Sequence, residues 1–125
     1  WYDGTIAEAV RAGSMPLIGE GEGMQSFIHL DDAASAAVAA LDAAPGTYNV
    51  VDDEPVRARD WLPLFARSLG APEPPRLTAE EGLERAGWSA VHRMTEQRGA
   101  SNAHALDCLG WEPEHPSWRA ELAAG

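Results

Sequence analysis

Residues 21–41, GEGMQSFIHLDDAASAAVAAL, contain the pattern that decides the fold. The glycines at the start predict a turn, and the short apolar run that follows, up to Leu30, predicts a strand. Asp31 or Asp32 then supplies a capping side chain and negative charge at the start of a helix whose interior is mostly alanine. Small side chains let such a helix lie close against another element. The stretch therefore indicates an α/β fold.

The segments on either side extend the same pattern. Residues 16–18 are predicted to form a strand that pairs as a hairpin with residues 25–30, and residues 46–51 a further strand. Capped or amphipathic runs predict helices in residues 5–12, 31–44, 57–70, 78–87 and 101–110, with a last turn or two after residue 115. We expect about three short strands and four or five helices. Residues 1–125 are expected to form a single domain, since this length suffices for one modest core.

Composition excludes several classes of function. The net charge is −11 and no basic cluster is present, which argues against nucleic-acid binding and against an anionic membrane surface. No apolar run approaches the length of a membrane span. Cys108 is the only cysteine, so an intrachain disulfide is impossible and a reducing cytoplasm is the expected location.

Three segments follow one another in the chain: residues 21–41, GTYNVVDDEP (46–55) and SNAHALDCLGWEP (101–113). In this order and spacing they resemble the C-terminal part of the extended short-chain dehydrogenase/reductase family, the NAD-dependent epimerases and dehydratases. Residues 21–41 are similar to the family's G-x-G-x-x-R-D-F-V-H-V-D-D-x-A segment. GTYNVVDDEP (46–55) is similar to its G-x-Y-N-V-G strand, and SNAHALDCLGWEP (101–113) to its D-x-S-K-A-x-x-x-L-G-W-x-P helix. The resemblance covers nearly the whole chain.

The resemblance implies that a catalytic half precedes this region. In the family, that half carries a G-x-x-G-x-x-G turn for the dinucleotide and a Y-x-x-x-K pair for proton transfer, and WYDGT (1–5) resembles the continuation of its last loop. The chain is then a fragment, the substrate-binding lobe without the Rossmann core. NAD or NADP is the cofactor of the full-length family, and none is expected to bind this chain alone.

The residues themselves agree that catalytic groups are missing. The Gly-rich segment Gly19–Gly23 does not open a helix, so it cannot direct helix N–H groups at a pyrophosphate. The sequence contains no lysine, so neither Tyr2 nor Tyr48 can form a tyrosine–lysine pair. We expect no catalytic and no cofactor-binding residue in this chain.

Three residues are candidate substrate contacts. Gln25 stands where the family places an arginine that pairs with a diphosphate, which disfavours a nucleotide-sugar substrate; alternatively Gln25 simply faces water. Arg98 could contact an anion, or form a surface ion pair with Glu96. Trp1 leaves the loop that lines the family's active site, so it could touch substrate or be exposed.

Other reactive residues have structural interpretations. His29 next to Asp31 and Asp32 suggests helix capping, and no metal site is expected. Cys108 has no basic neighbour in sequence and is expected to be packed as a small hydrophobe. The acidic loop 52–54 is expected to be solvated.

Two functions remain open. The first is the substrate-binding part of an NAD(P)-dependent epimerase, dehydratase or related oxidoreductase, inactive alone, with a small-molecule substrate. The second is a truncated, non-catalytic module that binds a small molecule or dimerises. Under either function the alanine-rich helix is expected to expose an apolar patch, which would contact the missing Rossmann half or a second copy of the chain.

Overall fold

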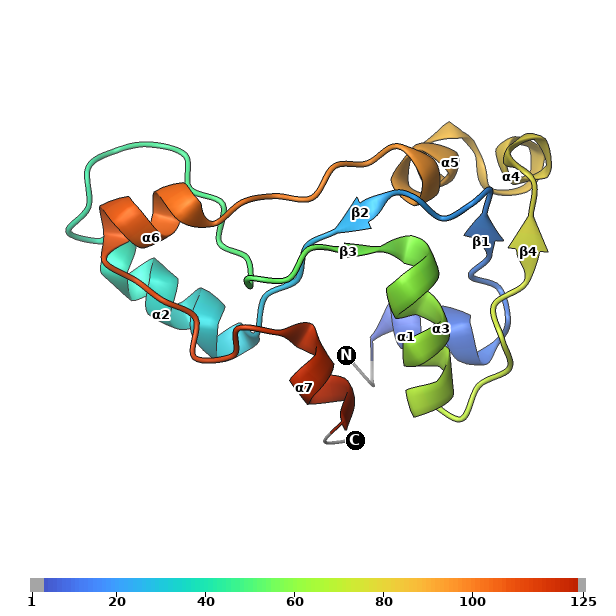
Figure 1. Cartoon of the computed structure of the whole chain (residues 1–125), viewed down its shortest axis with the longest axis horizontal. Helices are drawn as coiled ribbons and strands as arrows, with labels where there is room; N and C mark the ends of the chain where they lie inside the picture. Colours follow the sequence, from blue (N-terminus) through green and yellow to red (C-terminus); the bar gives the residue numbers. More distant parts are fainter. Residues whose placement is uncertain (1–3, 124–125) are drawn as a thin grey trace. The chain divides into compact units, whose positions relative to one another are not determined.

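The computed structural model describes residues 4–123 and has an α/β fold (Figure 1). The helices in this part of the chain are α1 (Thr5–Arg11), α2 (Leu30–Ala40), α3 (Ala58–Ser68), α4 (Ala79–Ala86), α5 (Trp88–Thr95), α6 (Ala103–Leu109) and α7 (Trp118–Ala123). The strands are β1 (Leu17–Ile18), β2 (Met24–Gln25), β3 (Val56–Arg57) and β4 (Arg76–Leu77). None of these helices has the length and apolar character needed to cross a membrane.

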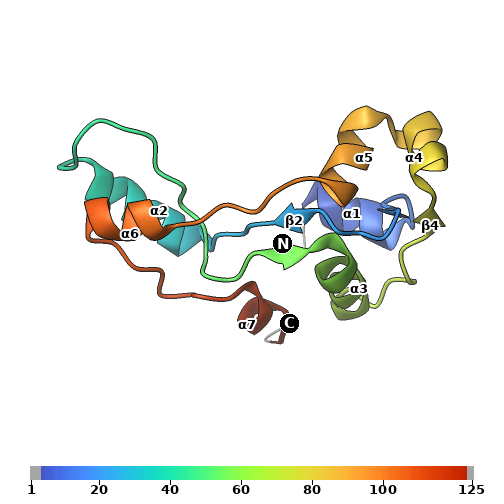
Figure 2. The same ribbon diagram turned by 45° about the horizontal axis from the view of Figure 1, so that its top comes forward.

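The described residues divide into two compact units. The first unit comprises residues 4–25 and 56–98, and the second comprises residues 26–55 and 99–123. Within the first unit α4 and α5 lie side by side, and within the second α2 lies against α6 (Figure 2). The prediction of a single domain remains a prediction, because compactness alone does not show whether the two units unfold together.

The strands pair differently from the predicted hairpin. β1 pairs in parallel with β4, and β2 pairs antiparallel with β3. The chain does turn between β1 and β2, where Gly19 and Gly21 have positive φ. The carbonyls of Gly21 and Gly23 then accept hydrogen bonds from N–H groups in the first turn of α3, at 3.1 and 2.9 Å. The hairpin prediction is wrong because this backbone holds the start of a helix.

Helix α3 supplies most of the first unit's core. Its apolar face is buried as the sequence predicts, and the rings of Trp61 and Phe65 lie 6.1 Å apart. The core also takes in both residues of β1, each no more than 1% exposed. Burial of several large apolar side chains is the main favourable contribution to the stability of this unit.

Two further sequence predictions need correction. Residues 46–51 form no regular strand; their end is held by a hydrogen bond from the N–H of Asp52 to the carbonyl of Phe27, 2.7 Å. The described residues contain seven helices rather than four or five, because α5 was not expected and the last turn or two predicted after residue 115 form a helix, α7. Gly87, with φ of 82°, ends α4 where the predicted helix over 78–87 ends, and α5 begins directly after it.

The second unit has a small apolar core. Ala36 of α2, Ala105 of α6 and Trp111 form its buried centre, and the indole N–H of Trp111 donates to Ser35 Oγ at 2.9 Å. Alanine at both helix positions permits the close approach that the sequence indicated.

Helix α2 exposes its opposite face. The side chains of Leu30, Val38 and Leu41 are 83%, 67% and 81% exposed. They recur at helical spacing and form an apolar row on the surface of the second unit, called here the α2 face.

Candidate functional site

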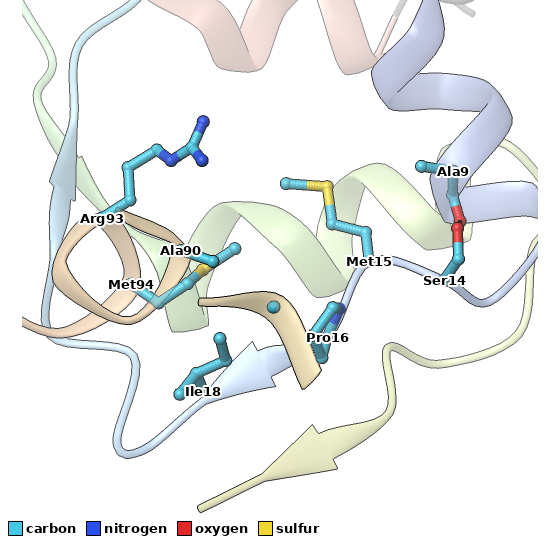
Figure 3. Close-up of a pocket in the computed structure, with 9 residues that line it drawn as sticks. Ala9, Ser14, Met15, Pro16, Ile18, Ala90, Arg93 and Met94 are labelled. Atoms are coloured by element: carbon cyan, nitrogen blue, oxygen red, sulfur yellow. Dashed lines mark hydrogen bonds between the residues drawn. The ribbon is translucent and has the colours of Figure 1, made fainter. Parts of the chain in front are cut away.

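The first unit contains a cavity of about 220 Å³. The cavity is lined by Ala9, Ser14, Met15, Pro16, Ile18, Ala86, Ala90, Arg93 and Met94. Figure 3 shows Met15 and Arg93 on opposite sides of the opening, with Ile18, Pro16 and Met94 below them. Most of the lining is apolar, as is usual for sites that bind small organic molecules.

Close packing of α4 on β1 forms the floor of this cavity. Ile18 is fully buried, and a Cβ placed on Gly82 of α4 would lie 2.7 Å from its Cγ2 atom. Only glycine allows α4 to approach this closely. The capping box of α4, in which Thr78 and Glu81 exchange hydrogen bonds of 2.8 and 3.1 Å, fixes where this helix begins.

The C-terminal end of α5 is held by β2 and the residues before it. The N–H of Gly23 donates to the carbonyl of Met94 at 2.9 Å, and a Cβ at Gly23 would overlap the carbonyl oxygen of Arg93. Gln25 Nε2 donates to that same carbonyl at 3.5 Å, and Gln97 Nε2 donates to Gln25 Oε1 at 3.4 Å. These contacts position the backbone of Arg93 and Met94, two of the three α5 residues that line the cavity.

The charge of the cavity comes from Arg93. Within residues 4–123 the Arg93 guanidinium forms no ion pair with a carboxylate. A guanidinium beside an apolar cavity offers a bidentate donor to a carboxylate whose body is apolar. The arrangement is therefore suited to a small amphipathic anion.

The three sequence-predicted contacts lie in different situations. Gln25 is not among the residues that line the cavity, but its side-chain amide donates a hydrogen bond to the carbonyl of Arg93, which lines it. Arg98 is exposed, and within the described residues it makes no ion pair; Glu96 instead faces His92, 3.4 Å away. Trp1 lies outside the described residues. Sequence reasoning missed Met15, Arg93 and Met94. The amphipathic run of residues 88–95, which forms α5 and carries Arg93 and Met94, was the available signal.

The second unit buries two carboxylates that the sequence placed on the surface or at a cap. Asp32 is 1% exposed and accepts hydrogen bonds from the N–H groups of Glu114 and His115, at 2.8 and 3.0 Å. Burial raises the pKa of Asp32, but these hydrogen bonds and the His115 side chain outweigh burial and leave the pKa below its ordinary value. The predicted aspartate cap is wrong: His29 is the N-cap residue, and its Nδ1 accepts from the N–H of Asp31 at 3.2 Å.

In the acidic loop 52–54, Asp52 and Glu54 have protein partners, contrary to the expectation of a solvated loop, and only Asp53 is exposed as expected. Asp52 is 2% exposed and accepts from the N–H groups of Glu54 and Trp118, at 3.1 and 3.0 Å. Burial is the main cause that raises the pKa of Asp52. Glu54 pairs with Arg119 and accepts from the Ser117 hydroxyl, and burial is outweighed by these partners, so the pKa of Glu54 is lowered.

Cys108 is exposed, contrary to the expectation of a packed thiol. Its Sγ lies 3.4 Å from Nδ1 of His104, one helical turn earlier on α6. The His104 ring stacks on Tyr48 with 5.2 Å between ring centroids. The sequence carried this signal in the four-residue spacing of the histidine and the cysteine.

Comparisons with known proteins identify a curated relative and several solved structures that are similar to this chain. No known family profile matches the chain. A Streptomyces protein named 3-diazoavenalumate denitrifying reductase is 50% identical over 121 residues, covering 96% of this chain and 40% of that protein. The chain thus spans less than half the length of the curated relative it matches.

Solved structures show the fold. A human epimerase family protein solved with NADPH has a TM-score of 0.73 and 22% identity, over 95% of this chain and 41% of that one. UDP-glucose 4-epimerase from Thermotoga maritima, solved with UDP-glucose, has a TM-score of 0.59 and 19% identity, over 86% of this chain and 32% of that one. The resemblance predicted from sequence is confirmed: this chain has the fold of the C-terminal portion of extended short-chain dehydrogenases and epimerases.

Proposed function

We propose that this chain is the substrate-binding part of a longer NAD(P)-dependent reductase and that it is inactive by itself. The observation that carries the proposal is its 50% identity, over 121 residues, to 40% of the length of a protein named as a reductase. NAD or NADP would be held by the portion of the longer protein that this chain does not include. We place the protein in the cytoplasm, where a single unpaired cysteine stays reduced.

The substrate is a small carboxylate with an apolar body. Support comes from the cavity, in which Met15, Ile18 and Met94 offer apolar contacts and Arg93 offers a cation. The similar Streptomyces protein is named for 3-diazoavenalumate, which is a carboxylate by its name. Arg98 and Trp1 are proposed to contact the same substrate, and Gln25 to position Arg93.

A nucleotide-sugar fits this site poorly. Gln25 stands where the family's diphosphate-pairing arginine is expected, and its amide already bonds the Arg93 carbonyl and Gln97. A neutral, engaged amide gives a diphosphate neither charge nor a free donor. The cavity of about 220 Å³ is also smaller than the range usual for drug-sized ligands, about 300–1,000 Å³.

Catalysis requires groups from outside the chain. Proton transfer and dinucleotide binding in the family depend on a tyrosine–lysine pair and a Gly-rich turn, and the sequence contains no lysine. This chain's residues would bind and orient the substrate, with Arg93 holding its carboxylate while Met15 and Met94 exclude water from its apolar body.

The α2 face is proposed to be covered by the nucleotide-binding half of the longer protein. The side chains of Leu30, Val38 and Leu41 are between 67% and 83% exposed in this chain. Burying a side chain of this kind stabilises a protein by about 1.5–3 kcal/mol. The second candidate function, a non-catalytic module that dimerises, rests on the same face. A sedimentation experiment at several concentrations separates the two, because only the module predicts a stable dimer.

Calorimetric titration of the purified chain tests the substrate proposal, with trans-cinnamate as the probe. We expect saturable binding of cinnamate that Arg93→Met weakens about 10-fold or more, because a charge-assisted hydrogen bond is lost. Arg85→Met, at an exposed arginine outside the cavity lining, is the matched control and should leave binding unchanged. Tighter binding of UDP-glucose than of cinnamate, or equal affinities in the two variants, would overturn the proposal.

A further inference from the structure

Two histidines and a glutamate from distant parts of the sequence meet in the second unit. One ligand atom each of His29, His115 and Glu121 lies within 4.8 Å of the others, and all three residues are half-buried. His29 Nε2 is 3.8 Å from Glu121 Oε2. The imidazole rings stack with their centroids 3.7 Å apart and an interplanar angle of 18°.

A buried carboxylate orients one of these histidines. Asp32 Oδ2 lies 3.2 Å from Nδ1 of His115, and Asp32 itself is fixed by the backbone N–H groups of Glu114 and His115. With Nδ1–H donated to this carboxylate, the lone pair of His115 Nε2 is left available. A carboxylate behind a histidine is the usual support of a metal-bound imidazole, since it fixes the tautomer and raises the basicity of the ligand nitrogen.

From this geometry we propose that His29, His115 and Glu121 bind a divalent transition-metal ion of the Zn²⁺ class, with Asp32 as the orienting carboxylate. Two imidazoles and one carboxylate form a donor set that zinc accepts, with a fourth position open to water or another ligand. Imidazole nitrogens favour zinc and similar ions over Ca²⁺ or Mg²⁺, which select oxygen ligands.

Binding requires a defined rearrangement of side chains. Tetrahedral zinc with bonds of about 2.0–2.1 Å needs donor atoms about 3.4 Å apart, so the three side chains must close and the stacked rings must splay. His29 now accepts the Asp31 N–H at Nδ1, so the neutral ring carries its proton on Nε2. On metal binding that proton moves to Nδ1, where Asp31 Oδ2, 3.8 Å away, can accept it. No net proton is gained or lost.

The sequence could not reveal this set. Considered with only Asp31 and Asp32, His29 offered no zinc spacing, and the fold adds His115 and Glu121 from the far end of the chain. The site is separate from the Arg93 cavity, so the two proposals stand or fall independently. The other close histidine and sulfur pair, His104 and Cys108, offers only two donors and serves as the control.

Calorimetric titration of the EDTA-treated, dialysed chain with ZnCl₂ tests the proposal. We expect one zinc ion per chain, with affinity reduced at least 10-fold in His29→Ala, in His115→Ala and in Glu121→Gln. Asp32→Asn should cost about 10–100-fold, as loss of a second ligand shell does elsewhere. The double variant His104→Ala/Cys108→Ser should bind zinc within about twofold of wild type, since it lies outside the proposed site.

Folding is monitored by circular dichroism, and Glu121→Gln, at a partly exposed side chain, keeps the test valid if a histidine variant unfolds. Titration with Co²⁺ adds a spectroscopic readout, because tetrahedral coordination gives intense visible bands. The proposal is overturned if zinc does not bind at millimolar concentration, or if folded Glu121→Gln binds as wild type does. Loss of binding in the His104→Ala/Cys108→Ser variant alone would overturn it equally.

Discussion

The two compact units are stabilised by different kinds of burial. The first unit buries large apolar side chains around α3, among them Trp61, Leu62 and Phe65. The second unit buries little more than two alanines and two tryptophans, and it adds two carboxylates, Asp32 and Asp52. Apolar burial does not depend on pH, whereas a buried carboxylate bonded to backbone N–H groups does. The units should therefore respond differently to mutation and to acid.

The largest effect on stability is expected from a substitution in the apolar core of the first unit. Phe65 is fully buried, so Phe65→Ala should lower the free energy of unfolding by about 3–5 kcal/mol through lost transfer energy and a residual cavity. Urea denaturation measures this loss, and hydrogen exchange reports where protection disappears. Protection lost in residues 56–98 while residues 101–109 stay protected would show two separate units. Simultaneous loss in both would support the single domain predicted from sequence.

The second-largest effect is expected from removing the buried Asp32 carboxylate of the second unit, which accepts hydrogen bonds from the backbone N–H groups of residues 114 and 115. Asp32→Ala removes the acceptor of the N–H groups of Glu114 and His115 and should cost about 2–3 kcal/mol. Hydrogen exchange at residues 114–118 should accelerate. The matched variant is Asp31→Ala, at an exposed aspartate whose side-chain contact with His29 is a long one, 3.8 Å from Oδ2 to Nδ1. Its loss of unfolding free energy should be far smaller. Equal costs for the two variants would contradict the account.

Acid should weaken the second unit through the same carboxylate. The pKa of Asp32 is lower in the folded state than its ordinary value of 3.8, so its contribution is present above that value and is lost as pH falls through the folded pKa. Asp52 acts in the opposite direction: its raised pKa means that its ionised form costs stability, and protonation relieves that cost. The stability difference between wild type and Asp32→Asn should thus shrink as pH falls below about 4. A constant difference from pH 6 to pH 2 would refute this.

A smaller effect concerns the floor of the cavity. Gly82→Ala places a methyl group 2.7 Å from Ile18 Cγ2 and should destabilise by about 1–3 kcal/mol, reduced by up to about 1 kcal/mol through better helix propensity. Thermal unfolding measures the change. The control variant Ser89→Ala, in α5, should not destabilise the protein, because the Ser89 side chain is exposed. An unchanged or raised melting temperature for Gly82→Ala would show that α4 does not pack as described.

The smallest effect on stability belongs to the α2 face. Leu41→Ser should change the free energy of unfolding by no more than about 0.5 kcal/mol, because the side chain is 81% exposed. If the exposed α2 face causes weak, transient self-association of the isolated chain, the same variant should reduce it, as measured by sedimentation velocity. A large loss of stability would mean that Leu41 is buried in the native molecule.

Local signals predicted what local structure determines. The amphipathic pattern of α3 and the capping box at Thr78 and Glu81 each depend on residues a few positions apart, and both are present. The cavity and the hydrogen bonds from residues 114 and 115 to the Asp32 carboxylate were not predictable in this way. Asp32 bonds residues 82 and 83 positions away, and β1 pairs with a strand about 59 positions later in the chain. Such contacts are set by tertiary packing, which no short pattern encodes.

The His104–Cys108 contact is a different kind of omission. Both residues lie on α6 at a spacing of four, so helical geometry alone brings the ring and the thiol together. The residues adjacent to Cys108, Asp107 and Leu109, are not basic, so only the spacing of four carries the signal. The resemblance to extended short-chain dehydrogenases, in contrast, rested on three ordered segments and gave the fold correctly.

The measurement that tests the central claim most directly is titration of the purified 125-residue chain with NADPH and with NADH, followed by an assay of nicotinamide oxidation with cinnamate present. The account predicts that cinnamate binds, that neither dinucleotide binds, and that no nicotinamide is oxidised. Saturable dinucleotide binding together with turnover would contradict it, because the chain would then contain the catalytic half that we assign to another part of a longer protein.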